Sequence, residues 1–503
     1  MHKLEPNSGR YPSYRYPKTA RNTLSEQRAV AAGPSSDRSR SRFWDYSAPP
    51  LKPTSPSLEE DEIPHVTIIR PVKGLDEGLY ECLASSFQQS YPRQKLTIYL
   101  CVDSVSDPAY PVLERIVSDF PTFDARILVE EQDPILHGTG GDVHNLGPNP
   151  KIRNISRAYR EAKGEIVWII DCNVWVSNGV AGRMVDKLFG FLPGGLRTTP
   201  YKFVHQLPLV VDIEPAKLAA ERGLNDGGRL DEMFMATSHA KFYSAINTVG
   251  IAPCIVGKSN MFRKEHLDNL TDPSKNPILV ASDADRGRGI DFFSSYICED
   301  HLIGDLLWRS KIPGFRNHGL VRGDLAIQPI ADMSASAYIA RRVRWLRVRK
   351  WTVLTATLVE PGVESLLCSL YFSFGVTTLP WFHDALGVDQ SWATMGLVWI
   401  CAVTTWMLVD RQVFNRLHKC LSVEINDRTP GFARGIGREG GMSPKPFGTW
   451  LRAWLGREIL ALPIWTWAVL LGTTVTWRGK RFKVRMDMSV VAADASTGKT
   501  HDS

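Results

Sequence analysis

Short runs of β-branched and aromatic residues alternate with helix-like stretches from Ile63 onward. Two of the stretches between these runs, 79–89 and 152–163, space their apolar residues as one face of a helix does. Repetition of strand, helix and strand predicts an α/β domain with a mostly parallel sheet. The runs that we expect to form its first strands are 65–70, 95–103, 125–130 and 165–171.

Three long runs without charged residues follow, at 365–382, 391–409 and 459–477. Each approaches the ~20 residues of a membrane-crossing helix, although a buried core helix has the same composition. Aromatic residues near the ends of the first two favour crossing, whereas Pro463 interrupts the third. If all three cross, the basic residues after Trp477 lie opposite the α/β domain, against the positive-inside rule; a re-entrant third run avoids that conflict.

The composition adds a basic excess, with a net charge of +7 and a pI near 8.9. The excess concentrates beside the apolar runs and in the N-terminal tail, so anionic lipid headgroups are the expected partner and nucleic acid is not. Eight cysteines form no C-x-x-C pair, which is typical of small buried side chains in a reducing compartment. We therefore expect the soluble part to face the cytosol.

Three aspartates follow the ends of expected strands, where parallel sheets bind their ligands. Asp171 closes the run Val-Trp-Ile-Ile-Asp. An exposed carboxylate there suits a divalent cation, Mg²⁺ or Mn²⁺, that neutralises a diphosphate, but a carboxylate that caps the next turn explains the spacing equally well. Asp103 and Asp107 bracket Ser104-Val-Ser106 and either contact a nucleotide or form an Asx-turn.

An acidic pair, Glu299-Asp300, begins a predicted helix that runs to Trp308. As a helix cap, Asp300 would be stabilised by free backbone N–H groups and by the helix dipole. As a general base, its carboxylate would accept a proton from an attacking hydroxyl. Capping does not exclude catalysis, and the spacing does not choose between the two roles.

Six of the ten residues from Arg341 to Lys350 are basic, and they precede the first long apolar run. On a helix, Arg341 and Arg344 share a face. Guanidinium forks suit a diphosphate, and Trp345 suits either a ring face or the membrane interface. A juxtamembrane basic belt accounts for three of the other basic residues, Arg347, Arg349 and Lys350.

Three single basic side chains complete the candidate site. Lys73 in Arg-Pro-Val-Lys-Gly and Lys151 in Asn-Pro-Lys-Ile-Arg-Asn stand at strand or loop ends, where each contacts a phosphate or remains solvated. His239 in Thr-Ser-His-Ala either contacts an acceptor or leaving group, or has the structural role that single histidines more often have.

Taken in this order, the motifs resemble those of the ceramide glucosyltransferases over most of the chain. The resemblance implies a GT-A-like, Rossmann-like catalytic domain on the cytosolic face of Golgi membranes, followed by C-terminal transmembrane helices. It also implies inverting transfer of glucose from UDP-glucose to the primary hydroxyl of ceramide, with a divalent cation. The landmarks are Arg70-Pro-Val-Lys-Gly-Leu-Asp76, Leu100-Cys-Val-Asp103, Asn149-Pro-Lys-Ile-Arg-Asn154, Trp168-Ile-Ile-Asp171, Thr237-Ser-His239, Glu299-Asp300, Arg341-x-x-Arg344-Trp345 and Trp477-Arg-Gly-Lys-Arg-Phe.

The resemblance also implies roles for single residues. By position, Asp171 matches the aspartate that binds the metal and diphosphate, and Asp300 matches the catalytic base. His239 matches a histidine near the active site. The diphosphate and product-site motif is matched by Arg341, Arg344 and Trp345.

The chain departs from the family pattern in two places. Ser104 stands where the family usually has its first aspartate, so we expect Asp103 or Asp107 to substitute. Family members usually begin with a membrane helix, whereas the first 60 residues here contain no apolar stretch of that length. Anchoring is therefore expected from the C-terminal segments.

These observations divide the chain into five expected regions. They are a disordered basic tail (1–62), a GT-A-like catalytic domain (63–340), a basic interfacial helix (341–358), a multi-pass membrane region with about three apolar segments (359–477) and a basic C-terminal tail (478–503).

Two other functions compete with this hypothesis. A processive polysaccharide synthase of the chitin or hyaluronan kind shares a related acidic and R/Q-x-x-R-W pattern, but such enzymes usually need more membrane segments. An inactive membrane-bound nucleotide-sugar binder would explain Ser104, although the presence of Asp171 and Asp300 argues against it.

Overall fold

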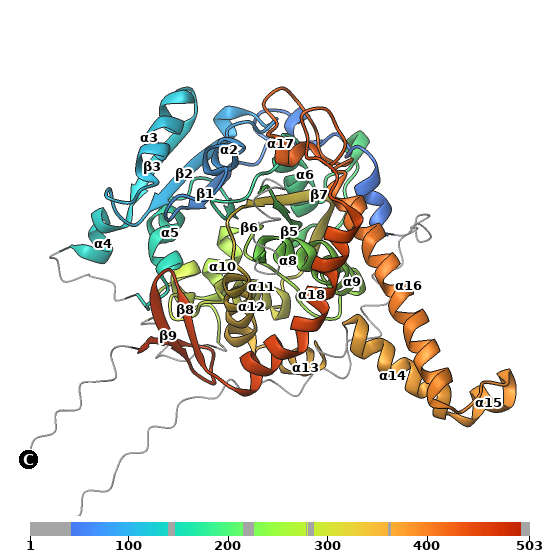
Figure 1. The fold of residues 1–503 in the computed structure, drawn as a ribbon. Coiled ribbons are helices and arrows are strands. Elements are labelled where there is room, and N and C mark those ends of the chain that lie inside the picture. The colour runs from blue at the N-terminus through green and yellow to red at the C-terminus, as the bar shows by residue number, and fades with distance from the viewer. Residues whose placement is uncertain are drawn as a thin grey trace, which may run out of the picture.

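The computed structural model describes residues 42–138, 146–214, 226–277, 279, 286–360 and 364–493. Its main sheet has the strand order β3-β2-β1-β4-β6-β5-β7 (Figure 1). Neighbouring strands pair in parallel except at β6, which is antiparallel to β4 and β5. The strands are β1 (Val66–Pro71), β2 (Leu96–Val102), β3 (Asp124–Val129), β4 (Ile166–Ile170), β5 (Tyr201–Asp212), β6 (Ser259–Arg263) and β7 (Arg316–Ile330). The mostly parallel α/β sheet is therefore confirmed.

Helices pack on both faces of this sheet because successive strand side chains point to opposite sides. Ile68 lies in one apolar cluster with residues of α2, α3 and α6, whereas Ile69 lies in another with residues of α5, α10 and α11. The helices of this part are α2 (Leu79–Ala84), α3 (Tyr110–Asp119), α4 (Pro134–His137), α5 (Pro150–Arg160), α6 (Val180–Phe189), α8 (Gly227–Phe234), α9 (Ala240–Val249), α10 (Lys264–Leu270) and α11 (Glu299–Arg309).

The segment before β1 is packed against the domain rather than extended into solvent. Tyr46 is buried, and the backbone N–H groups of Thr54 and Ser55 donate to the Asp186 carboxylate at 2.6 and 2.7 Å. Residues 42–62 therefore differ from the disordered tail that composition suggested, because a contact with α6, distant in sequence, orders them. Residues 1–41 lie outside the described part of the chain.

In the second half of the chain, α14, α15 and part of α16 project away from this body (Figure 1). Of the described helices, α16 alone is long and apolar enough to cross a membrane; α14 and α15 pass the same test only as a pair bent by 64°. The expected three apolar spans are thus reduced to one, or to two if the bent pair crosses. The helices are α12 (Ala335–Arg349), α13 (Leu354–Val359), α14 (Ser365–Thr378), α15 (Pro380–Leu386), α16 (Trp392–His418), α17 (Gly431–Arg434) and α18 (Phe447–Trp465).

The third apolar run does not form one helix. It is divided between the end of α18, a π-helical turn (Thr466–Leu470) and strand β8 (Thr474–Trp477). Beyond it, β9 (Lys480–Val484) and β10 (Val490–Ala492) complete a small antiparallel sheet with β8. The expected basic tail from residue 478 is therefore folded as far as residue 493, because its alternate apolar residues, such as Phe482 and Val484, are buried.

Candidate active site

Asp171 lies at the carboxyl end of β4, where two lysines hold its carboxylate. Its Oδ1 is 3.0 Å from Lys151 Nζ, and its Oδ2 is 3.0 Å from Lys258 Nζ. Lys151 comes from the first turn of α5, and Lys258 directly precedes β6. Burial alone would raise the pKa of Asp171, but the two ammonium groups hold it well below its usual range. Asp171 is therefore ionised at neutral pH.

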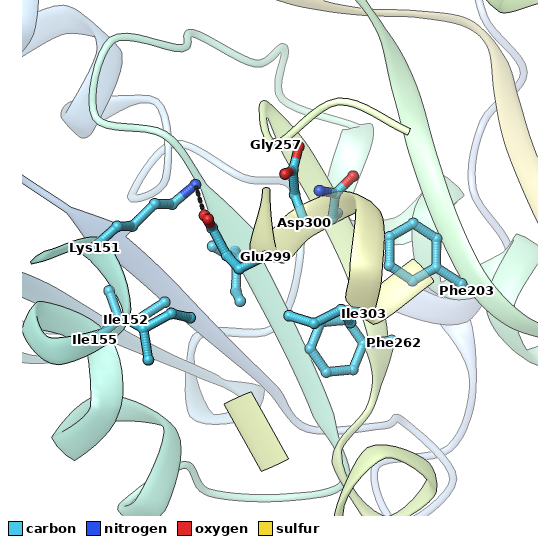
Figure 2. A pocket seen from close by; sticks show the side chains of 11 residues that line it. Lys151, Ile152, Ile155, Phe203, Gly257, Phe262, Glu299, Asp300 and Ile303 are labelled. Carbon is cyan, nitrogen blue, oxygen red and sulfur yellow. Dashed lines mark ion pairs between the residues drawn. The ribbon is translucent and has the colours of Figure 1, made fainter. Parts of the chain in front are cut away.

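Lys151 also links this carboxylate to the acidic pair at the start of α11. Its Nζ lies 3.2 Å from Glu299 Oε1, the ion pair drawn in Figure 2. Asn149, the N-cap of α5, donates its side-chain N–H to Glu299 Oε2 at 3.0 Å. Burial alone would lower the pKa of Lys151, but Asp171, Glu299 and Asp300 together raise it. Lys151 is thus a buried, charged ammonium rather than the solvated lysine that was one of the two alternatives from the sequence.

Asp300 lies in the first turn of α11, whose N-cap is Cys298, so Asp300 is not the N-cap residue, although backbone N–H groups at the start of the helix still stabilise its carboxylate. Its carboxylate is turned toward Gly257 (Figure 2). Burial raises the pKa of Asp300, against the opposing effect of the Lys151 ammonium. A carboxylate with a raised pKa is a stronger proton acceptor near neutral pH than an ordinary aspartate.

A narrow pocket lies beside these charges. One side carries Lys151, Glu299 and Asp300, and the opposite side is apolar (Figure 2). The apolar wall keeps water away from the charged side chains. Electrostatic interactions between these charges are therefore stronger than in bulk solvent. The apolar wall consists of Ile152, Ile155, Ile169, Phe203, Phe262 and Ile303.

Asp103, Asp107 and Lys73 form a separate cluster beyond β1 and β2. Lys73 Nζ lies 2.6 Å from Asp103 Oδ2 and 3.0 Å from Asp107 Oδ2. Asp107 Oδ1 also accepts from the backbone N–H of Ala109, the Asx-turn considered from the sequence, and these contacts keep the pKa of Asp107 low although burial opposes them. The cluster is on the same sheet edge as Asp171, but the described contacts do not join the two.

The two arginines of the Arg-x-x-Arg-Trp motif have different partners. Arg341 lies 3.4 Å from the buried Asp231 of α8 and stacks on the Trp345 ring at 4.8 Å. Arg344 has no ion pair within the described residues, and its guanidinium lies 6.0 Å from the centre of the Trp477 ring. Burial, with the nearby Arg341 and Arg478, lowers the pKa of Arg344 to about 10, against the pull of Asp171 and Glu299. Of the two arginines of the motif, Arg344 is the one that lies near the charges of Asp171 and Glu299.

His239 lies behind the site, at the end of a π-helical turn (Met235–His239). Its ring is 5.3 Å from the Tyr243 ring and 5.8 Å from the Phe234 ring. Burial and the neighbouring arginines of α12 lower the pKa of His239 to about 3, so its ring is neutral at physiological pH. It can accept or donate a hydrogen bond but cannot carry a positive charge there.

Sequence reasoning missed Lys258 as a partner of Asp171. Its only sequence signal is its place after Gly257 and before a short apolar run, and nothing there shows that β6 runs antiparallel and returns to the end of β4. It also left Arg347 and Lys350 in a basic belt at the membrane. Both donate to backbone carbonyls within the third apolar run: Arg347 to Trp467 and Thr474, and Lys350 to Val469.

The residues at Asp171 fit a divalent cation that takes only one or two of its ligands from the protein. Within the described residues no group of three or more His, Cys, Asp or Glu side chains could hold a metal ion. Mg²⁺, however, usually needs one or two carboxylates and takes its other oxygens from water and substrate phosphates. Asp171 supplies one ionised and partly exposed carboxylate, provided that Lys151 or Lys258 releases an oxygen.

The chain has weak overall likeness to solved glycosyltransferases. It is 18% identical to a mannosyltransferase from Pyrobaculum calidifontis solved with GDP-Man and Mn²⁺, over 76% of this chain and 92% of that one, with a TM-score of 0.35. For a glucosyl-3-phosphoglycerate synthase from Mycobacterium tuberculosis the identity is 14%, the coverage 53% and 71%, and the TM-score 0.28. Likeness of this size bears on neither substrate nor site.

Sequence comparison is decisive. The model of glycosyl transferase family 21 matches residues 42–272 and 278–490. The chain is 62% identical to a ceramide glucosyltransferase of Pyricularia oryzae over 454 residues, 89% of this chain and 90% of that one. It is 50% identical to a ceramide glucosyltransferase of Gibberella zeae over 490 residues, 92% of each. The resemblance inferred from the motifs is therefore confirmed, and the chain belongs to glycosyl transferase family 21.

Proposed function

We propose that this glycosyltransferase transfers glucose from UDP-glucose to the primary hydroxyl of ceramide with inversion, giving β-glucosylceramide. The observation that carries the proposal is that Lys151 joins Asp171 to the Glu299-Asp300 pair, with the unpaired Arg344 nearby. A proton acceptor and a group of cations thus lie together at the carboxyl edge of the sheet. Attack by a hydroxyl on a sugar diphosphate requires both.

Asp300 is the base in this mechanism. It accepts the proton of the ceramide hydroxyl through a carboxylate oxygen while the hydroxyl oxygen attacks the anomeric carbon. Attack comes from the side opposite the departing UDP, so a single displacement inverts the configuration. Because burial raises the pKa of Asp300, its proton affinity is closer to neutral pH than that of a solvated aspartate.

Arg344, Lys151 and Lys258 stabilise the departing diphosphate in our proposal. Guanidinium groups bind phosphate oxygens through paired N–H donors, and an ammonium acts as a point charge. Asp171 would hold a divalent cation together with the donor phosphates. When bound, such a cation neutralises charge that develops on the leaving group. Asp103, Asp107 and Lys73 are proposed to contact the nucleotide from the neighbouring strand ends.

The acceptor enters laterally from the bilayer, because a two-chain lipid is practically absent from water. Aromatic and aliphatic side chains more than half exposed lie along α14 and α16, with one more on α18, a pattern typical of a membrane-contacting surface. A second pocket lies between α12 and α18 and is lined by both charged and apolar residues. The exposed set includes Phe372, Trp392, Leu397, Ile400 and Ile459.

We place the catalytic domain on the cytosolic face of a Golgi membrane, with more than one membrane segment. All eight cysteines are free in the structure, as expected in a reducing compartment. Trp345 and His239 would then lie between the diphosphate site and the lipid-facing helices. We assign them the role of shaping the acceptor site, since both rings are uncharged at physiological pH.

The test is transfer of labelled glucose from UDP-glucose to a fluorescent ceramide by membranes that contain this chain. We compare the wild type with Asp300→Asn and, as a matched control on the same helix, Asp305→Asn. Loss of a general base lowers turnover by roughly 10²- to 10⁴-fold, so the β-glucosylceramide product should nearly disappear in Asp300→Asn while UDP binding is retained. A third arm with EDTA tests the cation.

Two outcomes would contradict the proposal. A fully active Asp300→Asn protein would remove Asp300 from the role of base. Wild-type protein that binds UDP but makes no glycolipid would favour the inactive binder, and a polymeric product would favour the polysaccharide synthase.

A further inference from the structure

The hairpin formed by β8 and β9 ends in a turn that carries an arginine in an unfavourable backbone conformation. Trp477 pairs with Lys480, so Arg478 and Gly479 are the two central residues of the turn. Their φ angles are 49° and 76°. This is the geometry of a two-residue hairpin that normally favours Asn-Gly. Arginine is disfavoured there, and unfavourable backbone conformations of this kind cluster at functional sites.

The small C-terminal sheet packs directly on the turn segment that leads into Asp300. Phe482 of β9 is buried in an apolar cluster with Ile297 and Cys298. The backbone N–H of Val490 donates to the Ser295 carbonyl at 2.8 Å. Figure 1 shows β8 and β9 beside α11 and α12, although they are far apart in the sequence. The position of the turn is thus determined by the same residues that position the proposed base.

Arg347 fixes the other end of the hairpin to α12. Its guanidinium donates to the carbonyls of Thr474 at 2.5 Å and Trp467 at 3.0 Å. A Cβ on Gly472 would lie 2.2 Å from Arg347 Nη2, so the segment passes close to the guanidinium because residue 472 has no side chain. Since Arg347 is three residues after Arg344 on the same helix, this contact sets the hairpin beside Arg344.

The result is a pair of guanidinium groups around one aromatic ring. Arg344 lies 6.0 Å and Arg478 5.4 Å from the centre of the Trp477 ring. Neither has an ion pair in the part of the chain that the structure describes. Both guanidinium groups also lie near the end of β4: the Asp171 charge raises the pKa of Arg344, and Arg478 opposes the rise that burial causes in the pKa of Cys172, the residue after Asp171. Two neighbouring, unpaired guanidinium groups repel each other, and an anion between them would relieve that repulsion.

We propose that Arg478 binds the diphosphate of the nucleotide-sugar donor together with Arg344, and that the C-terminal hairpin is therefore a part of the active site. This inference rests on the proposed function for the identity of the donor, but the anion site itself does not depend on the acceptor. The disfavoured turn conformation holds the guanidinium of Arg478 over the site before the donor binds.

The experiment measures UDP and uridine binding by detergent-solubilised full-length protein. We compare Arg478→Gln, Arg478→Asn, which suits the left-handed turn, and the matched control Arg481→Gln on the same hairpin, where the side chain is exposed. Loss of a charged hydrogen bond should weaken UDP binding roughly 10- to 100-fold in both Arg478 variants. Binding of uridine, which has no phosphate, should not change, and Arg481→Gln should behave as the wild type.

A second measurement uses the wild-type protein and does not depend on the folding of a variant. Phenylglyoxal modifies accessible arginines, and peptide mass spectrometry reports modification at each site. UDP, but not uridine, should protect Arg478 while Arg481 remains modified. Unchanged UDP affinity in the Arg478 variants, or no protection by UDP, would overturn the inference. If UDP binding depends on Arg478 but no glucosylceramide forms, the proposed acceptor fails and the inference stands.

Discussion

Gly257 lies directly against Asp300. A Cβ built on Gly257 would be 3.0 Å from Asp300 Oδ2 and 3.2 Å from Asp300 Cβ. The absence of a side chain at residue 257 therefore leaves room for the carboxylate, and the next residue, Lys258, pairs with Asp171. One short segment before β6 thus shapes the space around both the proposed base and the diphosphate aspartate.

Substitution of Gly257 should consequently move the base. Gly257→Ala requires a shift of a few tenths of an ångström, and Gly257→Val requires a larger one. Because a misplacement of about 1 Å can cost about 10²-fold in rate, we expect a graded loss of turnover that reaches about this size in Gly257→Val. The measurement is the initial rate of glucosylceramide formation by both variants, with their UDP affinity determined in parallel.

Gly448→Ala is the matched control for this series. A Cβ on Gly448, in the first turn of α18, meets no atom within 4 Å. This variant should keep the wild-type rate. Equal rates in Gly257→Val and wild type would mean that the position of Asp300 seen here is not the one it occupies during the reaction.

The pH dependence of the rate should report Asp300. The base acts only when ionised, so the rate must fall as the pH decreases through its pKa. Because burial raises the pKa of Asp300, this fall should occur above the usual range for an aspartate. The Asp300 charge raises the pKa of the adjacent Glu299. Because a Coulomb interaction is reciprocal, an ionised Glu299 also raises the pKa of Asp300. Glu299→Gln should therefore lower the pKa of Asp300 and move the fall to lower pH.

The quantity to measure is kcat/KM from pH 4 to pH 9 for wild type and Glu299→Gln. Glu265→Gln, an exposed carboxylate on α10, serves as the control and should leave the profile unchanged. An identical acid limb in wild type and Glu299→Gln would show that another group controls it.

The sequence predicted the parts of the site that adjoin clear patterns. Asp171 follows an apolar strand, and Asp300 begins an amphipathic helix, so both positions were found from local spacing. Which role each performs could not be found that way. A helix cap and a base have the same sequence context, whereas the N-cap position of Cys298 and the burial of Asp300 appear only in the structure.

Partners distant in the sequence were not predictable for a physical reason. Arg341 and Arg344 share a helix face, yet Arg341 turns to Asp231 of α8 and Arg344 lies near the acidic charges of the site. Arg347 and Lys350 have the composition of a membrane belt, but they donate to carbonyls of the π-helical turn that follows α18. These choices depend on which chain segment lies opposite, information that neither composition nor periodicity contains.

Arg183 should be important for stability rather than for chemistry. Its guanidinium on α6 donates to both oxygens of the buried Asp324 on β7, at 2.7 and 2.8 Å. It also lies 3.0 Å from Glu424, beyond α16, and so joins the catalytic body to the helices that follow. Removing one member of a buried pair leaves an unpaired charge, which typically costs about 3–5 kcal/mol. We expect Arg183→Met to lower the free energy of unfolding by this amount.

Chemical denaturation of the detergent-solubilised protein measures this loss. Arg115→Met is the comparison, because the Arg115 pair with Asp119 is exposed and such pairs contribute about 0–1 kcal/mol. A loss for Arg183→Met that is no larger than that for Arg115→Met would show that the buried pair is offset by its desolvation.

The C-terminus should lie on the same side of the membrane as the catalytic site. Strands β8 to β10 pack on residues 295–298 and on α12, so the third apolar run returns to the catalytic body instead of leaving it. The end of α16 also returns, since Phe414 and Leu417 are buried in the body. This arrangement removes the conflict with the positive-inside rule, because the basic hairpin stays with the catalytic domain.

Protease protection in sealed microsomes tests this topology with two tags. A tag after Ser503 should be digested without detergent. A tag between α15 and α16, at Val388, should be protected, because the bent pair α14 and α15 would cross outward and α16 would cross back. A protected C-terminal tag would contradict the packing of β8 to β10 on the catalytic body. A digested Val388 tag would mean that α14 to α16 lie along the membrane surface, since a hairpin that does not cross exposes its loop to the protease.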